Sequence, residues 1–108
     1  MEKFKVEINE IAEFTKALSH PARIEILKVL AEKQMCICGE IVEVLPLSQS
    51  TVSQHLKELK NIGLIQGEIE GKKSCYCINW ERFQELHDKY DDFFQNLLIQ
   101  KSNFNTCC

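Results

Sequence analysis

Six cysteines are the most reactive side chains of this 108-residue chain, and they occur as three close pairs. Thiolates bind soft ions such as zinc, cadmium, lead and trivalent arsenic, and neighbouring thiols also oxidise readily. In a cytosolic chain of this length, such pairs indicate metal or redox chemistry rather than structural disulfides. The pairs are Cys36-x-Cys38, Cys75-x-Cys77 and Cys107-Cys108.

A second group of polar side chains follows one predicted helix, residues 48–60. Val52, Leu56 and Leu59 form an apolar stripe on it, while its other side carries hydroxyl, amide and cationic groups. Amides and hydroxyls can read base edges in the DNA major groove, and lysines can reach phosphates. A plain surface helix is the alternative, but Ser and Thr form helices poorly unless they gain a contact. The candidate DNA contacts on this helix are Ser48, Gln49, Ser50, Thr51, Ser53, Gln54, His55, Lys57 and Lys60.

The net charge of −3 argues against a protein that coats nucleic acid without regard to sequence. It leaves room for sequence-specific binding, because lysines outnumber glutamates between Lys57 and Lys73. We therefore add Lys72 and Lys73, which follow Gly71, to the candidate DNA contacts.

Composition and the N-terminus predict a cytoplasmic protein without a membrane partner. Hydrophobic residues make up 44% and charged residues 27%, which is ordinary for a globular domain. Residues 1–7 carry charges where a signal peptide needs an apolar stretch, and no apolar run approaches the length of a membrane span. At 108 residues we expect one domain, over 1–108, that buries a further apolar face by self-association.

The elements that must position these side chains follow from apolar periodicity and from Pro and Gly. Pro21 suits the first turn of a helix, Pro46 ends a short one, and Gly63 ends the helix with the polar side. The predicted order is helices at 7–18 and 21–32, a strand at 35–38, helices at 39–45 and 48–60, strands at 64–70 and 74–80, and a helix at 81–101.

Two short helices joined by a tight turn over 40–60 form a helix-turn-helix, and the hairpin over 64–80 forms a wing. We therefore predict a mainly α (α+β) fold, a winged helix-turn-helix in a single DNA-binding domain. The helices at 7–18 and 81–101 are the expected dimerisation helices, because the small domain cannot cover their apolar stripes. The stripes comprise Ile8, Ile11, Leu18, Phe83, Leu86, Tyr90, Phe93, Phe94, Leu97 and Leu98.

Three motifs along this order resemble the ArsR/SmtB family of metal-sensing repressors. They are Leu-x-His-Pro-x-Arg at 18–23, Ser-Thr-Val-Ser-x-His-Leu-x-x-Leu at 50–59 and Gly-Leu-Ile at 63–65. The resemblance implies a homodimer, not an enzyme, that binds a palindromic operator. It also implies that the operator is released when a metal or metalloid binds, without any permanent cofactor.

The same resemblance suggests where the inducer binds. Sensors of the arsenic and cadmium/lead type carry Cys-x-Cys at the start of the helix-turn-helix, and Cys36-x-Cys38 matches this motif. Some arsenic sensors have a third cysteine where this chain has Ile41. The zinc type uses carboxylate and His ligands on the last helix, but Glu85 and His87 have no second His beside them.

Two cysteines cannot complete the coordination shell of any of these ions, because trivalent arsenic takes three thiolates and zinc, cadmium or lead take three or four. If the strand at 35–38 pairs with the return strand of the wing, Cys75 and Cys77 lie within reach of Cys36 and Cys38. The tail pair Cys107-Cys108 is a second source of thiolates. The alternative is that the strand cysteines fill an apolar sheet face, as free Cys often does.

We therefore expect a repressor of a resistance operon, released from an imperfect palindrome by arsenite, an organoarsenical or a soft divalent ion such as cadmium, lead or zinc. The alternative is a redox-sensing repressor of the same fold that is switched by cysteine oxidation. A thiol reductase is a poor fit, because the chain has no Cys-x-x-Cys and no βαβ pattern around a cysteine pair.

Overall fold

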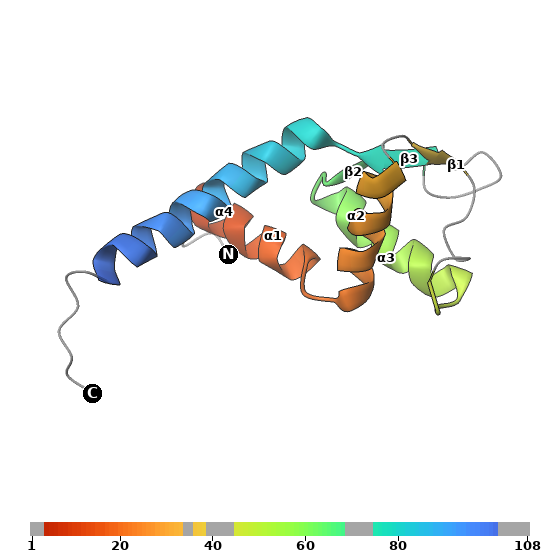
Figure 1. The fold of residues 1–108 in the computed structure, drawn as a ribbon, viewed down its shortest axis with the longest axis horizontal. Coiled ribbons are helices and arrows are strands. Elements are labelled where there is room, and N and C mark those ends of the chain that lie inside the picture. The colour runs from red at the N-terminus through yellow and green to blue at the C-terminus, as the bar shows by residue number, and fades with distance from the viewer. Residues whose placement is uncertain (1–3, 34–35, 39–44, 69–74, 102–108) are drawn as a thin grey trace.

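A computed structural model describes residues 4–33, 36–38, 45–68 and 75–101 (Figure 1). The elements are α1 (Val6–Ala17), α2 (Pro21–Lys33), β1 (Ile37–Cys38), α3 (Gln49–Asn61), β2 (Ile65–Glu68), β3 (Cys75–Ile78) and α4 (Trp80–Lys101). The mainly α winged-helix prediction is confirmed, and the predicted helix boundaries agree within one residue. The helix expected at 39–45, apart from Leu45, and the hairpin tip at 71–73 lie outside the described residues.

Local hydrogen bonds explain where α2 and α3 begin and end. His20 Nδ1 accepts the Ala22 backbone N–H at 3.0 Å, and Pro21 occupies the first turn of α2. The Ser48 hydroxyl accepts the Thr51 backbone N–H at the start of α3. At its end, Gly63 has φ +90°, and the N–H groups of residues 63 and 64 bond to the carbonyls of residues 60 and 59. This pattern is a Schellman motif, which needs the left-handed conformation that glycine tolerates.

The three strands form one antiparallel sheet in the order β1-β3-β2. Ile65 pairs with Ile78 across β2 and β3, while Cys38 pairs with Cys75 across β1 and β3. The predicted pairing of the Cys36 segment with the return strand of the wing is therefore confirmed. The described parts of the strands are shorter than the sequence predicts.

The core lies where α2, α3 and the sheet meet. The predicted stripe of α3 is buried, and it packs with residues from α1, both wing strands and α4. The largest fully buried side chains are Tyr76, Ile26, Leu59, Leu64, Ile65 and Leu86. Because α3 supplies three core residues, its inner face is fixed and its polar face points outward.

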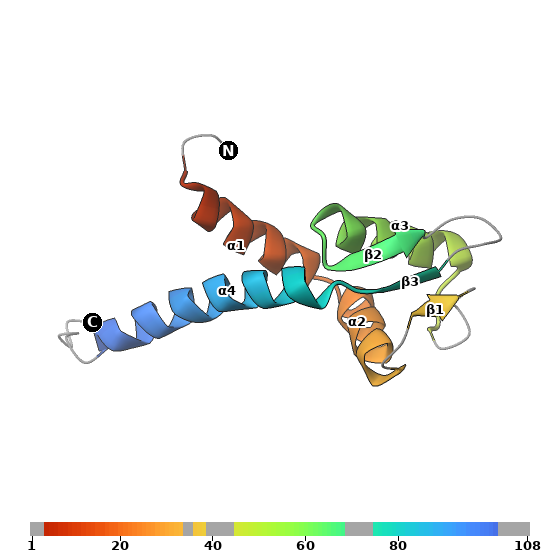
Figure 2. The ribbon, with the colours of Figure 1, turned by 90° about the horizontal axis from the view of Figure 1, so that it is seen from above.

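Helix α4 lies beside α1 and then extends away from the rest of the chain (Figures 1 and 2). Its first half packs within the chain, since Phe83 and Tyr90 lie edge-on to Phe14 with ring centroids 6.0 and 5.3 Å apart. Its second half exposes a row of large apolar side chains: Phe93, Phe94, Leu97, Leu98 and Ile99. No described helix has the combination of length and hydropathy that crossing a membrane requires.

Candidate functional site

The polar face of α3 is accessible along the helix. Gln49, Gln54 and Lys60 are exposed, whereas Val52 and Leu56 on the opposite side are buried. The start of α3 and the end of α4 lie at opposite ends of the long axis of the molecule (Figures 1 and 2). A helix held by one face and exposed along the other has the geometry that insertion into a major groove requires.

Three candidate DNA contacts are linked to one another at the start of α3. The Ser48 hydroxyl lies 2.9 Å from the Thr51 hydroxyl and 3.2 Å from the Ser50 hydroxyl. These contacts fix the first turn of the helix and orient its exposed hydroxyls. Ser53 and Lys57 lie about one and two turns further along α3, while Lys72 and Lys73 lie outside the described residues.

His55, another candidate DNA contact, lies against His20 at the start of α2. Its ring is half-buried, and its centroid lies 4.3 Å from that of His20. One turn away, Arg23 of α2 reaches Glu58 of α3 at 4.0 Å. Burial lowers the pKa of His55, and the charges of His20 and Arg23 lower it further against the opposing effect of Glu58. The two histidines therefore join α3, the expected recognition helix of the helix-turn-helix, to the start of α2.

The strand cysteines form two cross-strand pairs. Cys36 and Cys77 are joined by a disulfide with their Cα atoms 4.3 Å apart, and Cys75 is also disulfide-bonded. Cys38 is the register partner of Cys75, so the four positions lie together on neighbouring strands. Tyr76, which lies between Cys75 and Cys77, is 2% exposed and faces the core.

Because side chains alternate along a strand, the cysteines of β3 lie on the face opposite Tyr76. Cys36 is exposed, while Cys75 and Cys77 are half-buried. These three cysteines therefore do not fill the core, which was the alternative that the sequence left open. No group of three or more Cys, His, Asp or Glu side chains in the described ranges is placed to hold a metal ion. Cys107 and Cys108 lie beyond those ranges.

The two residues that the sequence offered toward a zinc site on the last helix have other partners in this structure. Glu85 forms an ion pair with Arg82 at 3.2 Å. His87 lies 3.3 Å from Asp88, and both side chains are more than half exposed. The two potential ligands on α4 thus have separate partners.

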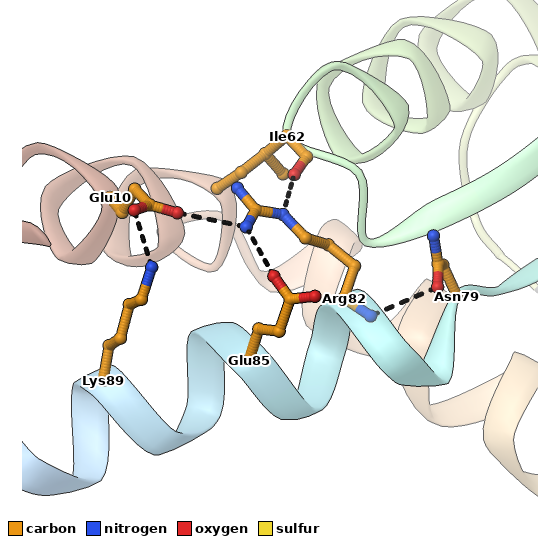
Figure 3. Close-up of polar contacts among 6 residues, drawn as sticks. All are labelled: Glu10, Ile62, Asn79, Arg82, Glu85 and Lys89. Atoms are coloured by element: carbon orange, nitrogen blue, oxygen red, sulfur yellow. Dashed lines mark hydrogen bonds and ion pairs between the residues drawn. The ribbon is translucent and has the colours of Figure 1, made fainter. Parts of the chain in front are cut away.

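A polar junction that the sequence analysis missed lies where α1, α4 and the end of α3 meet (Figure 3). Arg82 donates from Nη1 to Glu10 at 3.0 Å and from Nε to the Ile62 carbonyl at 3.3 Å. Lys89 donates to the other oxygen of Glu10 at 2.7 Å. One sequence signal was present: Arg82 and Lys89 are seven residues apart and therefore share a face of α4.

The start of α4 adds to this junction. The Asn79 side chain accepts the Arg82 backbone N–H at 3.2 Å, which caps the helix one residue earlier than the apolar pattern predicts. The Lys89 ammonium and, to a smaller extent, the Arg82 guanidinium hold the pKa of the Glu10 carboxyl below its usual value, against the effect of its burial.

A recognition helix packed on two helices and followed by an antiparallel hairpin defines a winged-helix DNA-binding protein. Residues 20–66 match the family model of the arsR family of bacterial regulatory proteins. The chain belongs to the ArsR/SmtB family of transcriptional regulators, and so it acts in transcription regulation and not as an enzyme.

Two relatives agree with this assignment, and a solved structure shares the fold. An uncharacterised helix-turn-helix transcriptional regulator of Methanocaldococcus jannaschii is 38% identical over 85% of this chain and 99% of its own. The arsenical resistance operon repressor of Staphylococcus aureus is 34% identical over 92% of this chain and 88% of its own. An ArsR-like transcriptional regulator from Rhodococcus has the same fold, with a TM-score of 0.65, 20% identity and coverage of 93% and 97% of the two chains.

Proposed function

We propose that this protein is a cytoplasmic repressor that binds its operator as a homodimer and leaves it when a thiophilic inducer binds the strand cysteines. The register of β1 and β3 carries the proposal, since it brings two Cys-x-Cys segments together on neighbouring strands. The similarity to the arsenical resistance repressor of S. aureus supports an arsenic(III) inducer.

The chemistry of the reduced pairs fits such an inducer. Directly opposite residues of an antiparallel sheet have Cβ atoms roughly 4.5 to 5.5 Å apart, which allows several sulfurs to reach one ion. Arsenic(III) needs three thiolates and a soft divalent ion needs three or four, so four cysteines can satisfy either. The outward position of Cys36, Cys75 and Cys77 leaves them accessible from solvent.

The same sheet connects these cysteines to the recognition helix. Tyr76 of β3 is buried in the core that also holds Val52 and Leu56 of α3. An inducer that draws β1 and β3 into a new geometry therefore alters the surface on which α3 rests. Release requires only that the inducer bind the DNA-free geometry more tightly than the DNA-bound one.

The Cys36–Cys77 disulfide supports a second candidate, a repressor switched by oxidation. In that case each pair of thiols loses two electrons and two protons to a hydroperoxide, which is reduced to an alcohol and water. A thiol reductant then restores the two thiols and the affinity for DNA.

A release titration separates the two candidates. Fully reduced protein is bound to a labelled palindrome selected from random DNA, and arsenite, methylarsenite, cadmium, lead, zinc and hydrogen peroxide are added in separate series under anaerobic conditions. Release by arsenite, at one equivalent per inducer site and without disulfide formation, supports the thiolate site. Release by peroxide alone, reversed by dithiothreitol, supports the redox switch instead.

A further inference from the structure

Among the side chains drawn in Figure 3, only that of Arg82, on α4, contacts both α1 and the end of the recognition helix α3. Its Nη1 also lies 3.2 Å from Glu85, so the guanidinium meets two carboxylates and one carbonyl. The side chain is 28% exposed. A planar guanidinium with several donors can bind groups from different segments at the same time.

The contact with Ile62 is at the position where α3 ends. Ile62 is the C-cap residue, and its carbonyl is one that the helix itself leaves unpaired. The stem of Arg82 lies against the next residue, since a Cβ added at Gly63 would be 3.1 Å from Arg82 Cγ. The end of α3 is thus held by a hydrogen bond and by packing on one α4 residue.

The other contact ties Arg82 to α1. Glu10 is 16% exposed and accepts from both Arg82 and Lys89, so one residue of α1 is linked to two positions of α4 that are seven residues apart. The same two helices expose the apolar row that the homodimer would cover. Lys89 shares the Glu10 contact, and this hydrogen bond joins α4 to α1 and not to α3.

We propose that Arg82 is a positioning residue that fixes the angle between the recognition helix and the α1–α4 pair, and thereby the operator spacing that the dimer reads. This role rests on the proposed homodimeric function. A helix of 13 residues is about 20 Å long, so a tilt of roughly 10° at its end moves the far end by about 3.5 Å. That displacement is close to one base-pair step of about 3.4 Å.

The test compares Arg82→Lys and Arg82→Gln with the matched control Lys89→Gln. Arg82→Lys keeps the charge beside Glu10 but cannot bond two segments in the same fork geometry. Lys89→Gln also weakens the Glu10 contact but leaves the Ile62 contact in place. Each protein is titrated with palindromes whose two half-sites are moved closer or further apart by one and two base pairs, and its dimerisation is measured by sedimentation.

We expect both Arg82 variants to remain dimers, to bind the best spacing about tenfold more weakly, and to discriminate less between spacings. Lys89→Gln should keep the wild-type preference for one spacing. The proposed role of Arg82 would be overturned if Arg82→Lys and Arg82→Gln kept the wild-type preference for one spacing. It would also be overturned if Lys89→Gln lost this preference to the same extent. A wild-type protein that is monomeric, or that binds single half-sites, would refute the homodimeric function itself.

Discussion

His55 of the recognition helix lies against His20 at the start of α2, with the ring centroids 4.3 Å apart. Burial is the main reason that the pKa of His55 is lowered, and the charges of His20 and Arg23 act in the same direction. Above about pH 6.5 this imidazole is neutral in both the folded and the unfolded chain. As the pH falls below that value, the unfolded chain takes up the proton more readily, so folding stability is lost.

We therefore predict that the midpoint temperature of thermal unfolding decreases when the pH is lowered from 7.5 to 5.5, and that it decreases less in His55→Gln. His87→Gln is the control, because the side chain of His87 is 54% exposed. Thermal unfolding followed by circular dichroism at several pH values measures the effect. Equal pH dependence in His55→Gln and in the wild type would contradict it.

Replacing the first cysteine pair should separate DNA binding from the response. The double variant Cys36→Ser and Cys38→Ser should bind the operator normally and should no longer be released by arsenite. A coupling of about 3 kcal/mol corresponds to a roughly 150-fold loss of DNA affinity in the wild type, which is easily measured by fluorescence anisotropy. Release of this variant by arsenite at wild-type concentrations would show that the inducer binds elsewhere.

The remaining ligands can be assigned by comparing Cys75→Ser with Cys77→Ser and with a chain truncated after Thr106. We expect the wing cysteines to be needed for the response, because the register already places them beside β1. The truncated chain should respond normally. If truncation abolishes the response and the wing variants keep it, the tail pair completes the site.

The two classes of DNA contact should differ in salt dependence. Changing Lys72 and Lys73 to Ala should weaken binding to all sequences alike and lower the slope of log affinity against log salt by about 2, since each phosphate contact contributes about 0.9. Gln54→Ala should alter base preference and leave that slope unchanged. Affinities at four salt concentrations decide this, and identical slopes for all three proteins would contradict the division of roles.

Glu10 should stabilise the fold at neutral pH and lose this effect in acid. Its pKa is lowered, so its contribution is complete above about pH 5 and disappears as the carboxylate is protonated at lower pH. Glu10→Gln should reduce the free energy of unfolding by about 1 to 3 kcal/mol at pH 7, with little difference remaining at pH 3. Urea unfolding at both pH values measures this, and Glu13→Gln, exposed on the same helix, is the control.

The exposed apolar row on α4 should hold the dimer together. Leu97 is 52% exposed, and Leu97→Glu would place a charge in the interface. We expect the wild type to be a dimer at micromolar concentration by sedimentation. The variant should be monomeric under the same conditions and should bind a palindrome more weakly. Gln95→Glu adds the same charge elsewhere on α4 and should leave the dimer intact. A monomeric wild type would disprove the homodimer.

The helices of this protein could be predicted from the sequence because their signals are local. Pro21, the Ser48 cap and Gly63 act within a few residues of themselves, and the stripe of Val52, Leu56 and Leu59 reflects the helical repeat alone. The family could also be predicted, because its motifs lie within such local segments. The pairing of the cysteine strands followed from the expected topology.

Tertiary structure alone decided which long-range contacts form. Arg82 bonds to Glu10, 72 residues away, and to Ile62, 20 residues away. The seven-residue spacing of Arg82 and Lys89 places both on one face of α4 but identifies neither partner. The same holds for the contact between His55, an expected DNA contact on α3, and His20, which lies just before α2. Side chains separated in sequence meet only after the core has set the angles between their helices, so their partners depend on packing rather than on residue type.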